Sequence, residues 1–461
     1  MASIFQLFPN SRPDSINRKI FRAALIVGVL GILARIAGTG KELVVAHAFG
    51  RSDALDAFLI AYLMPAFAVN LLMGALGSAL LPVLVETRQK QGAHAAEEFL
   101  SSTVCLSAVV LLIVAALLGL CAPLYLPLLG HGFPAAKLLL TRKLLYLLLP
   151  WVVFSGIATL LSYIMNAGEK FAAPAIVPLA TTSAVILCIV LARWGGIFSL
   201  VIGTVIGGLL EAVVLLRFLA THEIHLRFRW SGFDPRVRKM LAQYAPMLAG
   251  SFLMGGTAVV DQAIAAMLPG GSVAALNYAN KISGAIAVIG TTALSTAAFP
   301  YFSKMVAEND WHGCRHTLKR YVVLITAIAV PLTLLLIVFS KPIIRVLFQR
   351  GAFTSSDTEL VSLVQACYCL QLPFYFLGSL LARFISSMRR NDLLMYASAL
   401  NLGVNIVMDL VLMKVWGIAG IAVSTAIVYF VSVLFLSVSS IKLLRDHVPE
   451  VVTTVQAHAS Q

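Results

Sequence analysis

Long runs of apolar, uncharged residues follow one another along most of the chain. The runs 57–85, 104–130 and 415–441 each exceed the roughly 20 residues that a helix needs to cross a bilayer core. Six further uncharged runs of similar length follow, and three more spans, near 22–48, 195–217 and 393–413, are interrupted by single charges. The pattern predicts twelve transmembrane helices, near residues 22–48, 54–85, 99–125, 139–166, 171–192, 195–218, 239–267, 274–304, 318–340, 359–387, 393–413 and 416–442.

The composition agrees with this interpretation. Of the 461 residues, 60% are hydrophobic and only 12% are charged, whereas soluble domains carry about 25% charged residues. A water-soluble enzyme of this size is therefore excluded, because the chain has too little polar surface to cover it. The six cysteines form no metal-binding or disulfide pattern.

The positive charge indicates how the helices are oriented. The net charge is +14, and most of the 34 Lys and Arg residues fall in segments on one side of the predicted helices. The positive-inside rule places that side in the cytoplasm, together with both termini. The predicted organisation is a cytoplasmic N-terminal segment at 1–21, an N-lobe at 22–218, a cytoplasmic linker at 219–238, a C-lobe at 239–442 and a cytoplasmic tail at 443–461.

An internal repeat relates the two predicted lobes. The end of the second helix, at 75–82, and the end of the eighth, at 293–300, share the pattern A-L-x-[ST]-A-x-x-P. Weaker matches follow at nearly the same offset, which favours duplication, although each proline could simply kink its own helix. Six helices per repeat give two parallel repeats, and substrate paths usually lie between such repeats. The predicted fold is an all-α polytopic membrane protein with two six-helix lobes around a central cavity.

Ionisable residues within the predicted spans indicate a site. A charge in a span costs roughly 2.5–3.5 kcal/mol, so it usually faces a cavity or a partner. The charges lie in the first two helices of each lobe, and we expect them to line one partly basic cavity. Structural ion pairs between the lobes are the alternative. The charged residues are the bases Arg35, Lys41 and Lys281 and the acids Glu42, Asp56 and Asp261.

Weaker polar features complete the inventory of candidate sites. Asn401, Asn405 and Asp409 recur every four residues and form one stripe on the eleventh predicted helix. Hydrogen bonding between helices explains this stripe as well as a ligand site does. We find no P-loop, nucleophile elbow or metal-binding motif. The sequence therefore predicts a transporter rather than an enzyme, with no cofactor, no metal site and no nucleic-acid partner.

The N-terminal motifs carry a family resemblance. The run 35–42, R-I-A-G-T-G-K-E, is followed by L-D-A-F at 55–58 and A-L-L-P-V-L at 79–84. Together with 276–281 and F-Q-R-G-A-F-T at 348–354, these motifs resemble the MviN/MurJ family of lipid II flippases, in the multidrug/oligosaccharidyl-lipid/polysaccharide exporter superfamily. The resemblance implies an alternating-access cavity in which basic residues hold the diphosphate of an undecaprenyl-linked sugar.

Carried over by position, the resemblance assigns roles to the charged residues. Arg35, Lys41 and Lys281 would bind the diphosphate, and Asp56 stands at the acid of the family's T-D-A-F motif. Glu42, Asp56 and Asp261 are the candidates for gating or ion coupling. The membrane potential or an ion gradient would drive transport, with the ion unspecified.

Two departures from the family's pattern bear on the substrate. Val69 and Asn70 stand where the family carries an arginine pair, and the chain ends after twelve predicted helices where lipid II flippases have two more. These departures favour export of another lipid-linked oligosaccharide, such as an exopolysaccharide or O-antigen unit, over lipid II itself.

The remaining expectations concern partners, location and rival functions. The expected partners are the polyprenyl-diphosphate glycolipid, membrane lipids and glycan-assembly enzymes, in a bacterial inner membrane. A cation-coupled drug antiporter of the same superfamily and a non-transporting scaffold for glycan assembly are the alternative functions.

Overall fold

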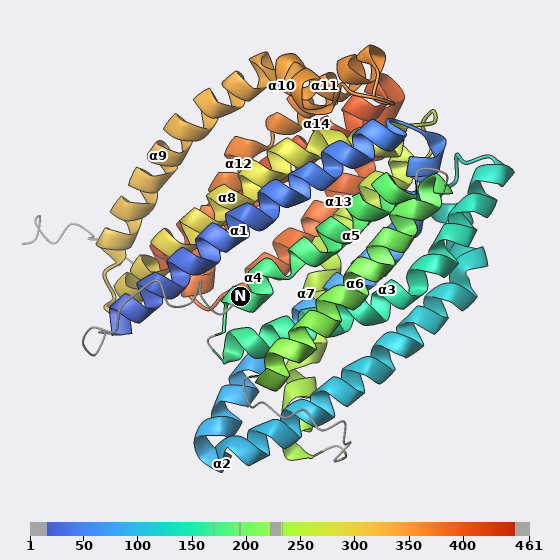
Figure 1. The fold of residues 1–461 in the computed structure, drawn as a ribbon. Helices are drawn as coiled ribbons and strands as arrows, with labels where there is room; N and C mark the ends of the chain where they lie inside the picture. Colours follow the sequence, from blue (N-terminus) through green and yellow to red (C-terminus); the bar gives the residue numbers. More distant parts are fainter. Residues whose placement is uncertain (1–15, 169, 193–194, 222–231, 233, 448–461) are drawn as a thin grey trace, which may run out of the picture. The chain divides into compact units, whose positions relative to one another are not determined.

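The computed structural model describes residues 16–168, 170–192, 195–221, 232 and 234–447, and this part of the chain is almost entirely helical. The predicted linker 219–238 and tail 443–461 lie largely outside the described residues. The helices, labelled in Figure 1, are α1 (Ile16–Phe49), α2 (Asp53–Leu129), α3 (Ala135–Ala167), α4 (Ala172–Ile176), α5 (Pro178–Leu191), α6 (Ile197–Thr221), α7 (Pro235–Ala265), α8 (Ser272–Ala307), α9 (Trp311–Val338), α10 (Ser340–Phe348), α11 (Ser355–Cys369), α12 (Leu372–Ser387), α13 (Asn391–Trp416) and α14 (Ile418–His447).

Eleven helical segments of the described chain are long and apolar enough to cross a membrane, by length and composition. They correspond to predicted spans two to twelve, and α1 covers the first predicted span. The predicted loop 86–98 is instead helical, except for a turn at Gly92 (φ 87°), so helix α2 contains the second and third predicted spans. The predicted helix 359–387 is divided into α11 and α12. Helix α10 lies in a segment for which the sequence predicted no element.

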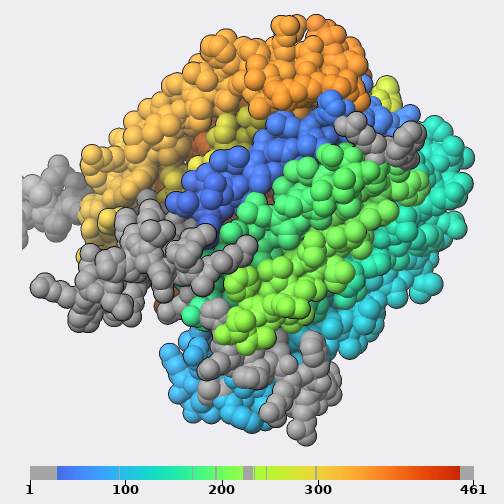
Figure 2. All heavy atoms as spheres, in the orientation of Figure 1, coloured from blue at the N-terminus to red at the C-terminus, as the bar shows by residue number. Residues whose placement is uncertain are grey.

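The exposed side chains of these helices indicate whether the helices face water or lipid. On α2, Leu120, Leu124 and Leu128 recur every four residues and are each more than 70% exposed. Helix α9, whose atoms form much of the light-orange surface in Figure 2, exposes Ile328 and Val338. Apolar stripes of this extent are unfavourable in water and suit lipid acyl chains.

The contacts divide the chain into two compact units. Unit 1 comprises 1–45, 72–117 and 147–244, and unit 2 comprises 46–71, 118–146 and 245–461. Within unit 1, α5 packs closely against α6, because Gly203 and Gly207 carry no side chain where the two helices meet. A Cβ atom at either position would collide with the backbone of Val185 or Thr181. Small residues allow such close approach of helices where lipid supplies no hydrophobic driving force.

The core of unit 2 lies between α8, α9, α11, α12 and α14. Phe302 on α8 and Phe384 on α12 pack there with their ring centroids 5.5 Å apart in a T-shaped arrangement. Both rings are fully buried. This packing holds α8 against α12, and α8 supplies half of the residues that line the pocket described below.

Candidate functional site

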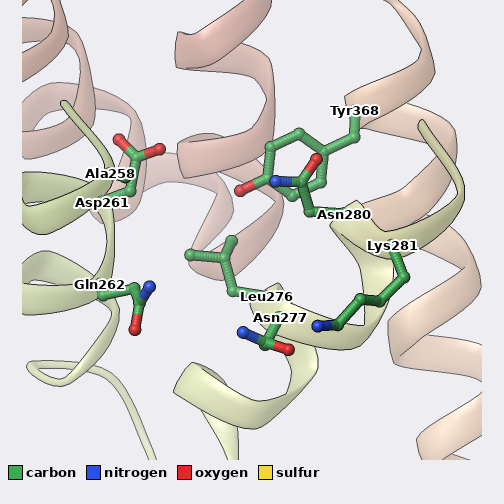
Figure 3. Close-up of a pocket in the computed structure, with 8 residues that line it drawn as sticks. All are labelled: Ala258, Asp261, Gln262, Leu276, Asn277, Asn280, Lys281 and Tyr368. Atoms are coloured by element: carbon green, nitrogen blue, oxygen red, sulfur yellow. The ribbon is translucent and has the colours of Figure 1, made fainter. Parts of the chain in front are cut away.

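A polar pocket lies within unit 2, between helices α7, α8 and α11. It encloses a cavity of about 140 Å³. Figure 3 shows its walls, with α7 on one side and α8 and α11 on the other. The residues that line it are Ala258, Asp261, Gln262, Leu276, Asn277, Asn280, Lys281 and Tyr368.

The pocket brings together two of the charged residues singled out from the sequence. Lys281 stands on α8 and Asp261 on α7, and both are partly buried. The Lys281 chain runs toward Asn277, one helical turn earlier on α8 (Figure 3). A basic and an acidic side chain thus share one cavity with neutral carboxamides, which is an arrangement suited to a zwitterionic or anionic polar ligand.

The stripe on α13 is connected to this pocket through Asp261. The Asn405 side-chain amide donates to Asp261 Oδ1 at 2.8 Å and lies 3.4 Å from Asp409 Oδ2. Asn405 and Asp409 are buried, and Asn405 Oδ1 accepts no hydrogen bond from the described residues. Asn401, one turn away, donates to Ser432 Oγ at 3.2 Å. Two carboxylates and a carboxamide oxygen are the donors that hard cations prefer.

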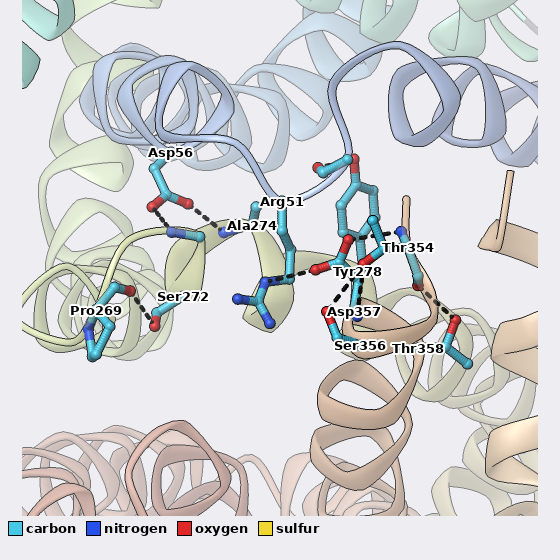
Figure 4. A network of polar contacts seen from close by, with 12 residues as sticks. Arg51, Asp56, Pro269, Ser272, Ala274, Tyr278, Thr354, Ser356, Asp357 and Thr358 are labelled. Carbon is cyan, nitrogen blue, oxygen red and sulfur yellow. Dashed lines mark hydrogen bonds and ion pairs between the residues drawn. The ribbon is translucent and has the colours of Figure 1, made fainter. Parts of the chain in front are cut away.

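Asp56 has a different environment from Asp261, in a group of contacts that we call the Asp56 clasp: Asp53, Asp56, Lys137, Gly271 and Ala274. The Asp56 carboxylate is 1% exposed. It accepts from the backbone N–H of Gly271 at 2.7 Å and of Ala274 at 2.8 Å, and from the Lys137 ammonium at 2.9 Å. Figure 4 shows both backbone contacts.

The clasp follows from the chemistry of a helix N-terminus. Helix α8 begins at Ser272, and its first amide groups have no partner within the helix. Gly271 precedes it with φ 82° and has no side chain to cap the helix. The Asp56 carboxylate satisfies two of these amides and places a negative charge at the positive end of the helix dipole. Asp56 therefore acts as the N-terminal cap of a helix more than 200 residues away in sequence.

A second set of contacts joins the turn between α1 and α2 to the segment before α11. Arg51 Nε lies 3.5 Å from Asp357 Oδ1, and the Ala352 N–H donates to the His47 carbonyl at 2.9 Å. Asp357 and Thr354 form a capping box at the start of α11 (Figure 4). The 348–354 motif noted in the sequence thus packs on the turn that follows α1.

Buried aromatic rings support the same region. Tyr278 donates its hydroxyl to the Gly50 carbonyl at 3.2 Å. Its ring packs against Phe348 and Phe353 at centroid distances of 5.3 and 5.5 Å. These contacts, together with the clasp, tie the ends of α1, α2, α3, α8 and α11 to one another.

The other three predicted site residues belong to unit 1. Arg35 is exposed on α1. Lys41 and Glu42 form an ion pair of 3.1 Å and are both partly exposed. A cavity shared by these residues and Lys281 stays a prediction.

Several residues of these sites were not identified from the sequence pattern. Lys137 was not among the residues predicted from the sequence, yet its side chain is 7% exposed and contacts both Asp53 and Asp56. Asn277 and Asn280 were not singled out, although their spacing with Lys281 places all three on one side of α8. That spacing beside a charged residue is the signal that could have indicated them.

The chain is similar to known proteins over most of its length. The model of the family described as lipid II flippase MurJ matches residues 45–460. A probable lipid II flippase MurJ from Rickettsia prowazekii is 27% identical, over 88% of this chain and 81% of its own length. One from Vibrio cholerae is 27% identical, over 92% of this chain and 83% of its own.

Solved structures share the same all-helical fold. A lipid II flippase MurJ in an inward closed conformation superposes with a TM-score of 0.77 at 24% identity, covering 92% of this chain and 90% of that one. An inward-facing MATE family transporter of the MOP superfamily gives a TM-score of 0.73 at 11% identity, covering 92% and 98%.

Proposed function

Because the chain belongs to the lipid II flippase MurJ family, we propose that it moves a polyprenyl-diphosphate-linked saccharide from the cytoplasmic to the outer leaflet of a bacterial inner membrane by alternating access. The observation that carries this proposal is the pocket of α7, α8 and α11. It places Lys281 around one cavity with Asp261 and three carboxamides. A cation at membrane depth is costly, so it usually faces the protein interior, a partner or a substrate path.

In this proposal the diphosphate is held by lysine and arginine. A diphosphate ester carries about two negative charges, so one lysine alone leaves part of the charge unpaired. We assign Lys281 to one phosphate, and Arg35 and Lys41 to the remainder. Phosphate oxygens accept strong, charge-assisted hydrogen bonds from both side-chain types.

The Asp56 clasp serves as a gate in the proposed cycle. By the Lys/Arg bias, the ends of α2, α3 and α8 that it joins would lie on the outer side of the membrane. Its bonds to the α8 amides would have to break before substrate could leave on that side. Buried, charge-assisted bonds are suited to this role, because each is strong while dry and weakens when water enters.

Two sources of energy are compatible with the site. If about two negative charges cross unpaired, a potential of about 100 mV, inside negative, favours outward movement by about 4–5 kcal/mol. The Asp261–Asn405–Asp409 cluster offers a second source, because its oxygen atoms can bind a sodium ion or a proton. Glu42, which pairs with Lys41, then adjusts the charge near the diphosphate.

Transport in vesicles tests the proposal. Purified protein is reconstituted with a fluorescent polyprenyl-diphosphate disaccharide, and flipping is followed by chemical quenching of the outer-leaflet probe. The triple variant Arg35→Gln, Lys41→Gln, Lys281→Gln should lose transport. Its matched control replaces the exposed residues Lys90, Lys304 and Lys341 by Gln, removes the same charge and should stay active.

The outcomes separate this function from its rivals. Full transport in the Arg35, Lys41 and Lys281 variant would refute the assignment of these residues to the diphosphate. A wild-type protein that ignores the lipid but exchanges cationic drugs for an ion would be an antiporter. A wild-type protein that moves neither would support the scaffold.

A further inference from the structure

Two carboxamides of the pocket make no hydrogen bond with the described part of the protein. Gln262 on α7 and Asn277 on α8 both line the cavity, and Figure 3 shows their side chains on facing walls. An unsatisfied amide within a membrane protein is unfavourable unless water or a ligand completes its bonds. These two side chains are therefore available to a ligand.

The neighbouring side chains restrict what that ligand can be. Asn280 already accepts from Ser283 Oγ at 3.2 Å, which leaves its N–H groups for another partner. Carboxamides both donate and accept, as do hydroxyl and acylamino groups, whereas phosphate oxygens at neutral pH mainly accept and an isoprenoid chain does neither. Three carboxamides around one cavity match the hydroxyl-rich part of a glycolipid better than its phosphates or its tail.

The spacing indicates which sugar the pocket can reach. Asn277 and Lys281 are four residues apart on α8, so their side chains are neighbours about 5–6 Å apart at Cβ. A phosphate held by Lys281 would therefore place the sugar directly bonded to it beside Asn277. The cavity of about 140 Å³ is smaller than the roughly 300 Å³ at which pockets for drug-sized ligands begin. A cavity of this size suits a single sugar ring.

We infer that Gln262, Asn277 and Asn280 form a subsite for the sugar nearest the diphosphate, which they bind through its hydroxyl or acylamino groups. This inference rests on the proposed function, because Lys281 must hold the adjoining phosphate. The protein then distinguishes a sugar-bearing polyprenyl diphosphate from the bare lipid carrier. Such a preference keeps the carrier from occupying the cavity without its saccharide.

Binding of two lipids that differ by one sugar tests the subsite. The probes are undecaprenyl diphosphate and its N-acetylglucosaminyl derivative, titrated against protein in nanodiscs. Each net hydrogen bond is worth roughly a factor of two to ten in affinity, so wild type should prefer the sugar-bearing probe by about tenfold. The double variant Gln262→Met, Asn277→Leu should bind both probes equally, with its affinity for the bare lipid within about twofold of wild type.

Two control variants make the result specific. Lys281→Met should weaken binding of both probes and keep their ratio. Gln89→Met, at an exposed carboxamide on α2, should change neither. Because neither Gln262 nor Asn277 bonds to the described protein, the double variant should also melt no lower than wild type. A fall of more than about 5 °C would instead give these side chains a structural role.

The failures of the two proposals are distinguishable. Wild type that binds both probes without preference, or a double variant that keeps the preference, would overturn the sugar subsite alone. Wild type that binds neither probe would overturn the proposed function as well.

Discussion

Replacement of Asp56 by asparagine should open the contacts around the N-terminus of α8. The carboxylate accepts three bonds, from Gly271, Ala274 and Lys137, at 2.7 to 2.9 Å and 1% exposure. Asparagine keeps one acceptor oxygen, so about two charge-assisted bonds are lost. At roughly 1.5–3 kcal/mol each, the closed arrangement loses about 3–6 kcal/mol, close to the roughly 3–5 kcal/mol for breaking a buried ion pair.

Cysteine labelling measures this change directly. Ser272 lies beside the clasp and is 6% exposed. Ser272→Cys, with the six native cysteines replaced by alanine, should react slowly with a membrane-impermeant maleimide. A loss of 3–6 kcal/mol shifts the equilibrium between closed and open forms by about two to four orders of magnitude. We therefore expect Asp56→Asn to accelerate labelling at least tenfold.

Asp53 supplies the matched control. It contacts the same Lys137 ammonium, but its side chain is 70% exposed. Exposed ion pairs contribute roughly 0–1 kcal/mol, so Asp53→Asn should change labelling by less than about fivefold. Equal rates in the two variants, or an unchanged rate in Asp56→Asn, would show that burial of the carboxylate does not hold this region closed.

Three further changes probe the neighbouring contacts and the acid in the pocket. Gly351→Ala should lower the melting temperature, because Gly351 has φ 59° and a Cβ atom there would meet His47; an unchanged thermal unfolding curve would contradict this. Asp357→Asn should cost about 1–2 kcal/mol, since it weakens a capping box and the ion pair with Arg51, and chemical denaturation would measure the loss. Asp261→Asn should make lipid transport independent of sodium and proton gradients; vesicles in which either gradient still stimulates this variant would exclude Asp261 as the ion carrier.

The helical architecture could be predicted because it depends on local sequence. An uninterrupted apolar run must satisfy its backbone hydrogen bonds internally within a membrane, so it forms a helix whatever its neighbours are. The residues at which the helices begin and end were less predictable. The segment around Gly92 is polar and reads as a loop, yet it is helical on both sides of a single turn.

The partners of the basic residues on the predicted outer side could not be predicted from the sequence either. Lys137 and Lys341 weaken the positive-inside pattern, and the sequence offers no reason for their presence. In the structure Lys137 lies within the Asp56 clasp, and Lys341 pairs with Glu359 at 3.1 Å. Partners so distant in sequence leave no local pattern.

Some residues of the candidate site could be found from the sequence, and others only from the structure. Lys281 and Asp261 could be found from the sequence because a charge in an apolar run is conspicuous. Gln262 and Asn277 are neutral, and neutral polar residues are common enough in membrane helices that only their place around one cavity singles them out. The stripe of Asn405 and Asp409 was visible as a periodicity, but its bond to Asp261 on another helix was not.

By itself the sequence determined that this chain is a helical membrane protein and where most of its helices lie. It also showed which charged residues fall within membrane spans, where an unpaired charge is costly. These properties follow from hydrophobicity and from backbone hydrogen bonding, both of which act within one segment. Only the tertiary structure decided that Asp56 caps α8 while Asp261 faces a pocket with Lys281. The two aspartates are chemically identical, and their different roles arise from the partners that packing brings to each.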